Sequence, residues 1–172
     1  MSCFLFLLPS IIFLKKKPKP VNTKKITLFA LRLLLGWVFF YAGITKILTP
    51  NWSAGGFLQG AKTFHGFYAW LAQASLIPWI SLINEWALFL LGVSLLLGIC
   101  IRLSGWLGAL LMLLYYLPGL TFPYIGQHAF LVDEHIIYIA CLILLATYHA
   151  GNTWGLEGYV KKYLPQRKPG KK

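Results

Sequence analysis

Four long apolar stretches dominate the sequence and limit what the chain can fold into. They lie at about residues 26–48, 78–101, 106–124 and 128–149. A helix needs about 20 mostly apolar residues to cross a bilayer, and a single segment satisfies its backbone inside hydrocarbon only as a helix. The sequence therefore predicts an all-α integral membrane protein whose central part, residues 26–150, is a bundle of four transmembrane helices.

The composition excludes several other classes of protein. Of the 172 residues, 58% are hydrophobic and 12% are charged, whereas a soluble domain has about 45–50% apolar and about 25% charged residues. A disordered chain and an ordinary soluble enzyme are both excluded. The net charge of +12 comes from Lys and Arg between the apolar stretches and in the tail. We therefore predict membrane lipid as the surroundings and no nucleic-acid partner.

The positions of Lys and Arg predict the orientation. If the N-terminal flank lies inside, thirteen of the sixteen Lys and Arg residues are on the inner side, and the other three are Lys46, Lys62 and Arg32. Short cytoplasmic loops carry an excess of Lys and Arg. We expect a multi-pass protein of the cell (cytoplasmic) membrane with both termini in the cytoplasm.

Three flanking segments complete the organisation. Residues 1–25 hold a short apolar segment and a basic cytoplasmic flank; residues 1–14 are an interfacial segment or an over-long start, with an uncleaved anchor as the alternative. Phe64, Phe67, Tyr68, Trp70 and Leu71 predict an interfacial helix in the first outer loop, where aromatic rings favour the membrane surface. Residues 151–172 form a basic tail in which Leu156–Leu164 predicts a short amphipathic helix.

The sequence indicates no haem, flavin or metal. The three cysteines, Cys3, Cys100 and Cys141, form no CxxC pair and no disulfide framework. No spacing of His, Cys, Asp and Glu is typical of a metal centre. The histidines of the fourth span have no histidine on another span at the same depth.

Each span carries one stripe of residues at helical spacing. The stripes are Arg32, Gly36, Phe39, Gly43 and Lys46; Glu85, Leu88, Gly92, Leu95, Ile99 and Arg102; Gly105, Gly108, Met112, Tyr115 and Gly119; and His128, His135, Leu142 and His149. Small residues let helices approach closely in lipid. We expect these stripes to face the interior of the bundle.

Ionisable residues are placed at one level of the predicted bundle. Lys46, Glu85, Asp133 and His135 all fall in its outer half. Such residues cost roughly 2.5 to 3.5 kcal/mol each near the centre of a membrane helix, so they indicate function by default. We expect them to meet in a polar pocket that faces outside, and we take these four as candidate catalytic residues.

Simpler interpretations remain open for these residues. Lys46 and Glu85 would equally suit a structural ion pair between two spans. Asp133 and Glu134 are adjacent, so they point about 100° apart on a helix and cannot both face one site. Arg32 has no acidic residue at its depth, and it either serves the site or extends toward the inner lipid phosphates.

Three sequence runs resemble the DoxX/DoxD-like family of membrane proteins. They are RLLLGWVFFYAGITKILTPNW at Arg32–Trp52, NEWALFLLGVSLLLGICIRLSG at Asn84–Gly105, and VDEHIIY followed by GNTWGLEGY within Val132–Tyr159. The outer segment WSAGGFLQGAKTFHGFYAWL is closer to the DoxD branch. The resemblance covers about residues 27–160. The positions that match the family pattern are Arg32, Gly36, Gly43, Lys46, Glu85, Gly92, Arg102 and Asp133.

The resemblance implies a quinone-linked reaction. DoxD is the small membrane subunit of a thiosulfate:quinone oxidoreductase, which oxidises thiosulfate to tetrathionate and passes electrons to quinone. By this resemblance Lys46 would attract thiosulfate, and Glu85, Asp133 or His135 would deliver protons to the quinone. The quinone would contact Tyr41, Trp86, Tyr115 and Tyr138, and a separate DoxA-like subunit would be the partner.

Two alternatives belong to other classes. The chain could be a non-catalytic membrane scaffold that docks a redox or envelope enzyme. A third possibility is a small transporter or lipid-binding bundle, of which the transporter is disfavoured because the sequence shows no inverted repeats or pairs of broken helices. The sequence does not give the oligomeric state.

Overall fold

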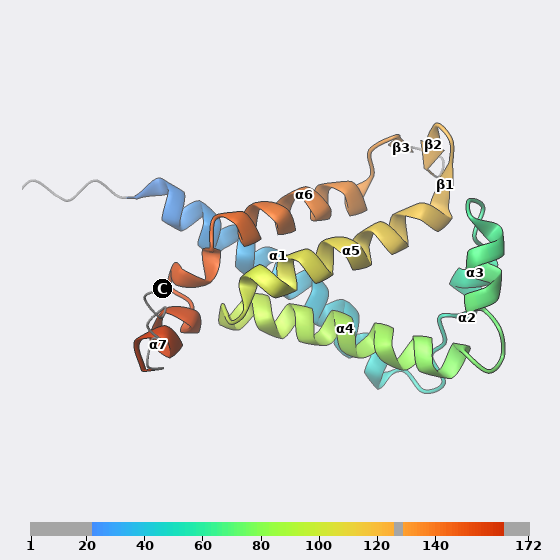
Figure 1. The fold of residues 1–172 in the computed structure, drawn as a ribbon, viewed down its shortest axis with the longest axis horizontal. Coiled ribbons are helices and arrows are strands. Elements are labelled where there is room, and N and C mark those ends of the chain that lie inside the picture. Colours follow the sequence, from blue (N-terminus) through green and yellow to red (C-terminus); the bar gives the residue numbers. More distant parts are fainter. Residues whose placement is uncertain (1–21, 126–128, 164–172) are drawn as a thin grey trace, which may run out of the picture.

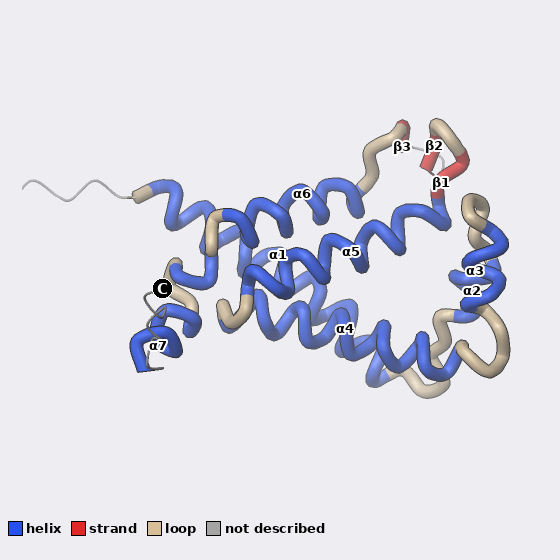
Figure 2. Tube along the Cα trace, viewed as in Figure 1, coloured by secondary structure: helices blue, strands red, loops and turns tan. Residues whose placement is uncertain are grey.

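A computed structural model describes residues 22–125 and 129–163 as a bundle of helices with a small cap at each end (Figures 1 and 2). The predicted segment 1–14, His128 and the last nine residues lie outside the described part. The main helices are α1 (Thr23–Leu48), α4 (Ile77–Leu97), α5 (Ile101–Gly119) and α6 (Glu134–Thr147).

The two ends of the bundle differ. One end carries the short helices α2 (Gly55–Gln59) and α3 (His65–Leu71) and three two-residue strands, β1 (Leu120–Thr121), β2 (Tyr124–Ile125) and β3 (Ala129–Phe130), which pair antiparallel in that order. We call it the aromatic end. The other, called the basic end, carries the start of α1, the α4–α5 turn, the 3-10 helix η1 (Ala150–Asn152) and α7 (Leu156–Tyr163) (Figure 1).

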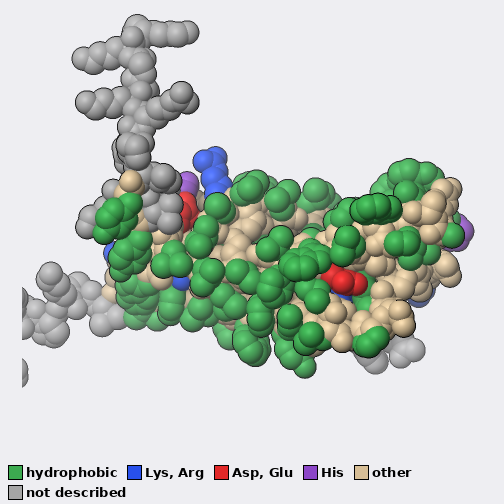
Figure 3. All heavy atoms as spheres, turned by 90° about the horizontal axis from the view of Figure 1, so that it is seen from below, with side chains coloured by type: hydrophobic (Ala, Val, Ile, Leu, Met, Phe, Trp, Pro, Cys, Tyr) green, Lys and Arg blue, Asp and Glu red, His purple; other side chains and the backbone are tan. Residues whose placement is uncertain are grey.

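Within the described residues, three helices, α1, α4 and α5, are long and apolar enough to cross a membrane. In Figure 3, hydrophobic side chains cover most of the helical part on the face shown. Helix α6 is apolar but has only 14 residues. At about 1.5 Å per residue it is roughly 21 Å long, which is shorter than the hydrocarbon core of about 30 Å. The prediction of a full fourth helical span over 128–149 was therefore wrong in its extent, although α6 packs in the bundle.

Local backbone signals move the predicted helix ends. Gly98 takes a left-handed conformation (φ 71°) and ends α4 at Leu97, and α5 already begins at Ile101. Residues 102–105, which separate the second and third predicted spans, are thus part of α5. Helix α5 ends at Gly119 instead of residue 124, because Pro118 occupies its last turn and the chain then continues into β1.

Glycines set the closest helix contacts, as the predicted stripes indicated. A Cβ added to Gly43 would lie 2.4 Å from the Phe89 backbone nitrogen, and one added to Gly92 would lie 2.2 Å from that of Phe40. These two positions hold α1 against α4. On the other side of the bundle, a Cβ on Gly105 would lie 2.8 Å from the Ala146 Cβ, so α5 and α6 are equally close.

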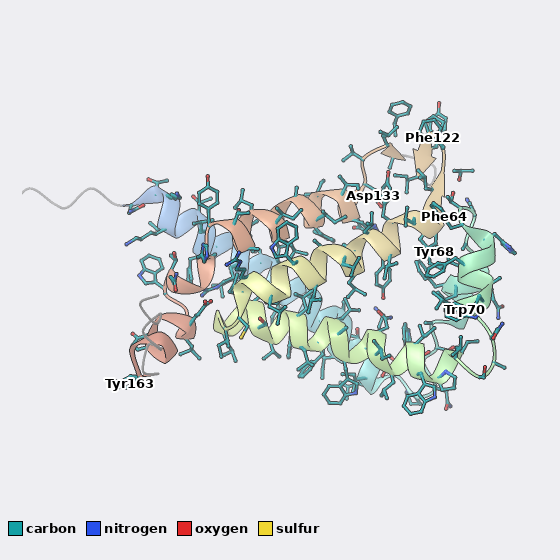
Figure 4. The ribbon with its side chains drawn as sticks, in the orientation of Figure 1. Phe64, Tyr68, Trp70, Phe122, Asp133 and Tyr163 are labelled. Atoms are coloured by element: carbon teal, nitrogen blue, oxygen red, sulfur yellow. The ribbon has the colours of Figure 1, made fainter. Side chains whose placement is uncertain are left out.

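Helix α3 is attached to the bundle by a tyrosine that compensates for a proline. Pro118 has no N–H, so the Leu114 carbonyl four residues earlier loses its helical donor. The Tyr68 hydroxyl donates to that carbonyl oxygen at 3.0 Å. Tyr68 is 2% exposed, whereas Trp70 on the same helix and Phe64, the residue just before it, are 54% and 61% exposed (Figure 4). A helix is therefore present in this loop with one anchored face, and its position at a membrane interface stays a prediction.

At the basic end Arg32 joins α1 to the C-terminal segment. Its guanidinium nitrogens donate to the carbonyl oxygens of Ala150 (2.9 Å), Thr153 (3.0 Å) and Trp154 (3.3 Å). The side chain is 1% exposed, so the interpretation that Arg32 extends toward lipid phosphates was wrong. Its Nε is buried without a hydrogen-bond partner in the described part of the chain.

Two glycines make room for this arginine. A Cβ added to Gly98 would lie 2.6 Å from Arg32 Nη1, and one on Gly155 would lie 2.7 Å from the same atom. The Glu157 backbone N–H donates to the Gly98 carbonyl oxygen at 3.1 Å, which ties the start of α7 to the end of α4. Arg32 therefore holds the turn that positions α7.

Replacement of Tyr68 by Phe is expected to destabilise the aromatic end. The Leu114 carbonyl would be left without a donor in an apolar environment, at a cost of about 1–3 kcal/mol. The measurement is the thermal unfolding midpoint of the detergent-solubilised chain. Tyr159→Phe, at a position 65% exposed, is the matched control and should unfold like the wild type. Equal midpoints for all three chains would contradict the role of Tyr68.

Replacement of Arg32 by Gln is expected to release the C-terminal segment. Hydrogen bonds that involve a charged group contribute about 1.5–3 kcal/mol each, and three are lost. Amide hydrogen exchange should accelerate over Ala150–Glu157 and leave α4 largely protected. Lys25→Gln, on the exposed start of α1, removes the same charge and should have no effect. Unchanged exchange in Arg32→Gln would show that the segment is held in another way.

Candidate functional site

Asp133 fixes the start of α6 and binds His135. Its Oδ1 accepts hydrogen bonds from the backbone N–H groups of His135 (3.0 Å) and Ile136 (3.2 Å), which is the geometry of a helix N-cap. Its Oδ2 lies 2.6 Å from His135 Nδ1. Asp133 is therefore the cap of α6 and not a residue within a span, as Figure 4 shows. The two side chains are largely buried, with 12% and 25% of their surface exposed.

A polar connection runs from this pair across the bundle. The ring of His135 stacks on the ring of Tyr115, with centroids 5.9 Å apart and planes 11° apart. The Tyr115 hydroxyl donates to Asn84 Oδ1 at 2.6 Å. The contacts therefore join α6 to α5 and α5 to α4. Polar side chains between apolar helices commonly hydrogen-bond across them in this way.

A cavity of about 290 Å³ lies beside this connection. We call it the aromatic-end cavity. Helices α2 and α3 provide one wall, and α4 and α5 provide the other. The lining is apolar except for Tyr68, Asn84 and Tyr115. The Tyr68 hydroxyl is already used on Leu114, and burial raises the pKa of Tyr68 above its ordinary value. Tyr68 therefore stays neutral over the physiological pH range.

Asn84 is the residue of this cavity that the sequence reasoning missed. Its Oδ1 accepts from Tyr115, and its amide NH₂ donates no hydrogen bond within the described part of the chain. It is partly buried. An amide side chain in an apolar helix, one position before Glu85, was the available sequence signal. The cavity thus offers one neutral hydrogen-bond donor to a ligand.

Lys46 and Glu85 form a separate group on the α1–α4 pair. Lys46 interacts electrostatically with Glu85, donates to the Ala42 carbonyl oxygen at 3.4 Å and lies 5.3 Å from the Trp52 ring. No nitrogen–oxygen distance of 4 Å or less joins Lys46 to Glu85. Neither residue lines the aromatic-end cavity, and neither do Asp133 and His135. The four predicted catalytic residues therefore lie in two groups, and the structure does not bring them into one pocket.

The other predicted site residues are distributed over the bundle. Of the four predicted quinone contacts, Tyr115 lines the cavity. Tyr138 packs edge-on against Phe39 at 5.7 Å between centroids. Tyr41 and Trp86 are 59% and 47% exposed on the outside of the bundle.

Most residues that match the family pattern lie where helices and segments pack together. Gly36, Gly43 and Gly92 lie at the α1–α4 contact, and Arg32 lies in its carbonyl cluster. Arg102 is exposed near the start of α5. Over residues 22–125 and 129–163, no group of three or more His, Cys, Asp and Glu side chains is placed to hold a metal ion.

Comparison with known proteins supports a single family. No curated protein and no solved structure matches the chain. The family model named DoxX matches residues 27–118, which is more than half of the 172-residue chain and runs from near the start of α1 to the last turn of α5. This chain belongs to the DoxX family of membrane proteins.

Proposed function

We propose that the chain is a DoxD-like membrane subunit of a quinone-linked oxidoreductase, and that the aromatic-end cavity receives the quinone ring. The observation that carries the proposal is the free amide NH₂ of Asn84 in an apolar cavity. A quinone ring is flat and apolar and carries two carbonyl acceptors. Its apolar body would suit the walls, and one carbonyl would accept from Asn84.

The size of the cavity supports this class of ligand. Sites for small molecules typically have volumes of about 300–1,000 Å³. At about 290 Å³, the aromatic-end cavity is suited to one substituted ring and is too small for a dinucleotide or a flavin nucleotide. No charged residue lines it. A neutral ligand is therefore favoured over an anion in the cavity itself.

In this proposal the Asp133–His135 pair supplies the protons. Reduction of a quinone to a quinol takes up two electrons and two protons. His135 lies against the Tyr115 ring, which lines the cavity, and its Nδ1 is held by Asp133. Nε2 is then the ring nitrogen available for proton exchange. Tyr115 therefore contacts both parts of the proposed site: it lines the cavity for the quinone ring, and its ring stacks on His135.

Thiosulfate would be the source of the electrons. Oxidation of two thiosulfates to one tetrathionate releases two electrons, the number that one quinone accepts. The family resemblance assigns this step to a complex with a separate DoxA-like subunit. Lys46 is the residue that would attract thiosulfate near the aromatic end, and Glu85, which interacts with it, would moderate that attraction.

The orientation follows the distribution of basic residues. The basic end carries Lys24, Lys25, Arg102, Lys161 and Lys162, and the aromatic end carries Lys46 and Lys62. By the positive-inside tendency, the basic end would face the cytoplasm of a cell membrane and the aromatic end would face outside. Thiosulfate would then arrive from outside.

The test is the quinone content of the purified chain. The wild type, solubilised in mild detergent and extracted with solvent, should contain quinone in proportion to protein. Asn84→Leu should lower the content about 3- to 10-fold, since one neutral hydrogen bond contributes about 0.5–1.5 kcal/mol. Tyr115→Phe is the matched control, because it breaks the same Tyr115–Asn84 bond between helices and leaves the amide in place.

Two results would contradict the proposal. One is a wild-type chain with no quinone above the level of the co-purified lipid, which would favour the scaffold alternative. The other is an Asn84→Leu chain that keeps the wild-type content. Equal losses in Asn84→Leu and Tyr115→Phe would show that the bond between α4 and α5 matters and the amide donor does not.

A further inference from the structure

A second cavity of about 430 Å³ lies between α4 and α5. We call it the α4–α5 groove. Its lining runs from Ala87 to Ser94 on α4 and from Cys100 to Leu114 on α5. Leu90, Leu103, Leu107 and Leu110 of this lining are more than half exposed. The groove therefore opens on the outer surface of the bundle, where the helices would meet lipid.

The groove exists because α4 and α5 are kept apart by side chains. The α1–α4 and α5–α6 contacts are made over glycines, where backbones approach closely. Between α4 and α5 the Leu91 side chain packs over Gly108 instead, and a Cβ on Gly108 would lie 2.8 Å from a Leu91 methyl carbon. Leu91 forms the floor of the groove, and the space outside it is unfilled.

The groove adjoins the aromatic-end cavity. The two cavities share Leu111 and Leu114 as lining residues. From Tyr115 in the cavity to Cys100 at the far end of the groove, α5 rises about 22 Å at about 1.5 Å per residue. That distance is most of the hydrocarbon thickness of about 30 Å.

The groove has no free polar group for a ligand. Its polar side chains other than Cys100 are Ser94 and Ser104, whose hydroxyl oxygens lie 2.7 Å apart. The Ser94 hydroxyl donates to the Ile99 carbonyl oxygen at 2.5 Å, and the single proton of the Ser104 hydroxyl goes either to Ser94 Oγ or to the Cys100 carbonyl oxygen at 2.9 Å. The groove is thus suited to an apolar chain, and the hydrogen-bond donor for a head group lies at the other end, on Asn84.

We propose that the α4–α5 groove holds the isoprenoid chain of the quinone whose ring occupies the aromatic-end cavity. The inference rests on the proposed function and adds that the ligand is a long-chain quinone, with its chain directed toward Cys100. A phospholipid is the other membrane molecule with a long apolar chain. Its charged head group fits poorly, because no residue that lines either cavity is charged.

The native thiol of Cys100 reports on the occupied groove. Cys100 is a free, exposed cysteine that lines the end of the groove. In a chain with Cys3→Ala and Cys141→Ala, the rate of Cys100 alkylation by a water-soluble maleimide is measured in detergent. Saturating long-chain quinone should slow alkylation several-fold. The same ring without a chain should bind and leave the rate unchanged.

A matched pair of α5 variants tests the path of the chain. Leu107→Trp fills the groove and should abolish the protection of Cys100 by long-chain quinone. Leu113→Trp, at a position 40% exposed that lines neither cavity, should keep it. Equal protection in the two variants would overturn the inference.

The remaining outcomes separate this inference from the proposed function. Quinone that binds in an Asn84-dependent manner without protecting Cys100 would leave the ring site in place and overturn the chain site alone. Protection of Cys100 by added phospholipid as strong as that by long-chain quinone would identify an acyl chain as the occupant and also overturn it. A chain that retains no quinone at all would overturn both.

Discussion

A single proline determines how the aromatic end is built. In an apolar environment every backbone carbonyl needs a donor, and Pro118 removes the one that Leu114 would have in a regular helix. The Tyr68 hydroxyl supplies it, and the same loop provides two more contacts: the Lys62 N–H donates to the Pro118 carbonyl oxygen at 2.9 Å, and the Thr63 hydroxyl donates to that of Leu120. These bonds hold α3 across the end of α5. The aromatic-end cavity lies beneath it.

The basic end follows the same physical rule with a charged donor. There the carbonyl oxygens of Ala150, Thr153 and Trp154 converge on the Arg32 guanidinium, so main-chain dipoles stabilise the buried charge. Gly98 and Gly155 leave the space that this arrangement needs. Both ends are thus closed by one side chain that reaches main-chain oxygens on a distant segment.

Sequence periodicity predicted the packing face of α1 well, whereas Arg102 and His149, which the predicted stripes placed inside the bundle, are exposed near helix ends. Local backbone chemistry explains most of the other errors. The stripe of Arg32, Gly36, Phe39 and Gly43 is the buried face of α1, because the helical period and the need for close contact leave one arrangement. The fourth apolar stretch was misjudged, since hydropathy alone does not show that residues 129–130 pair as a strand or that Asp133 caps α6. Asn84 was overlooked because its importance comes from Tyr115 on another helix, 31 positions away.

The α4–α5 groove would determine the route by which a ligand reaches the protein. Asn84 and Tyr115 join the two helices toward one end, and Ser94 and Ser104 join them toward the other, while the leucine-lined opening between these bonds lies on the outer surface. An apolar molecule that occupies the groove would enter sideways from the bilayer without passing through water. Its occupancy would then depend on its mole fraction among the membrane lipids, and enzymes that change this fraction would control the protein with no change in any aqueous concentration.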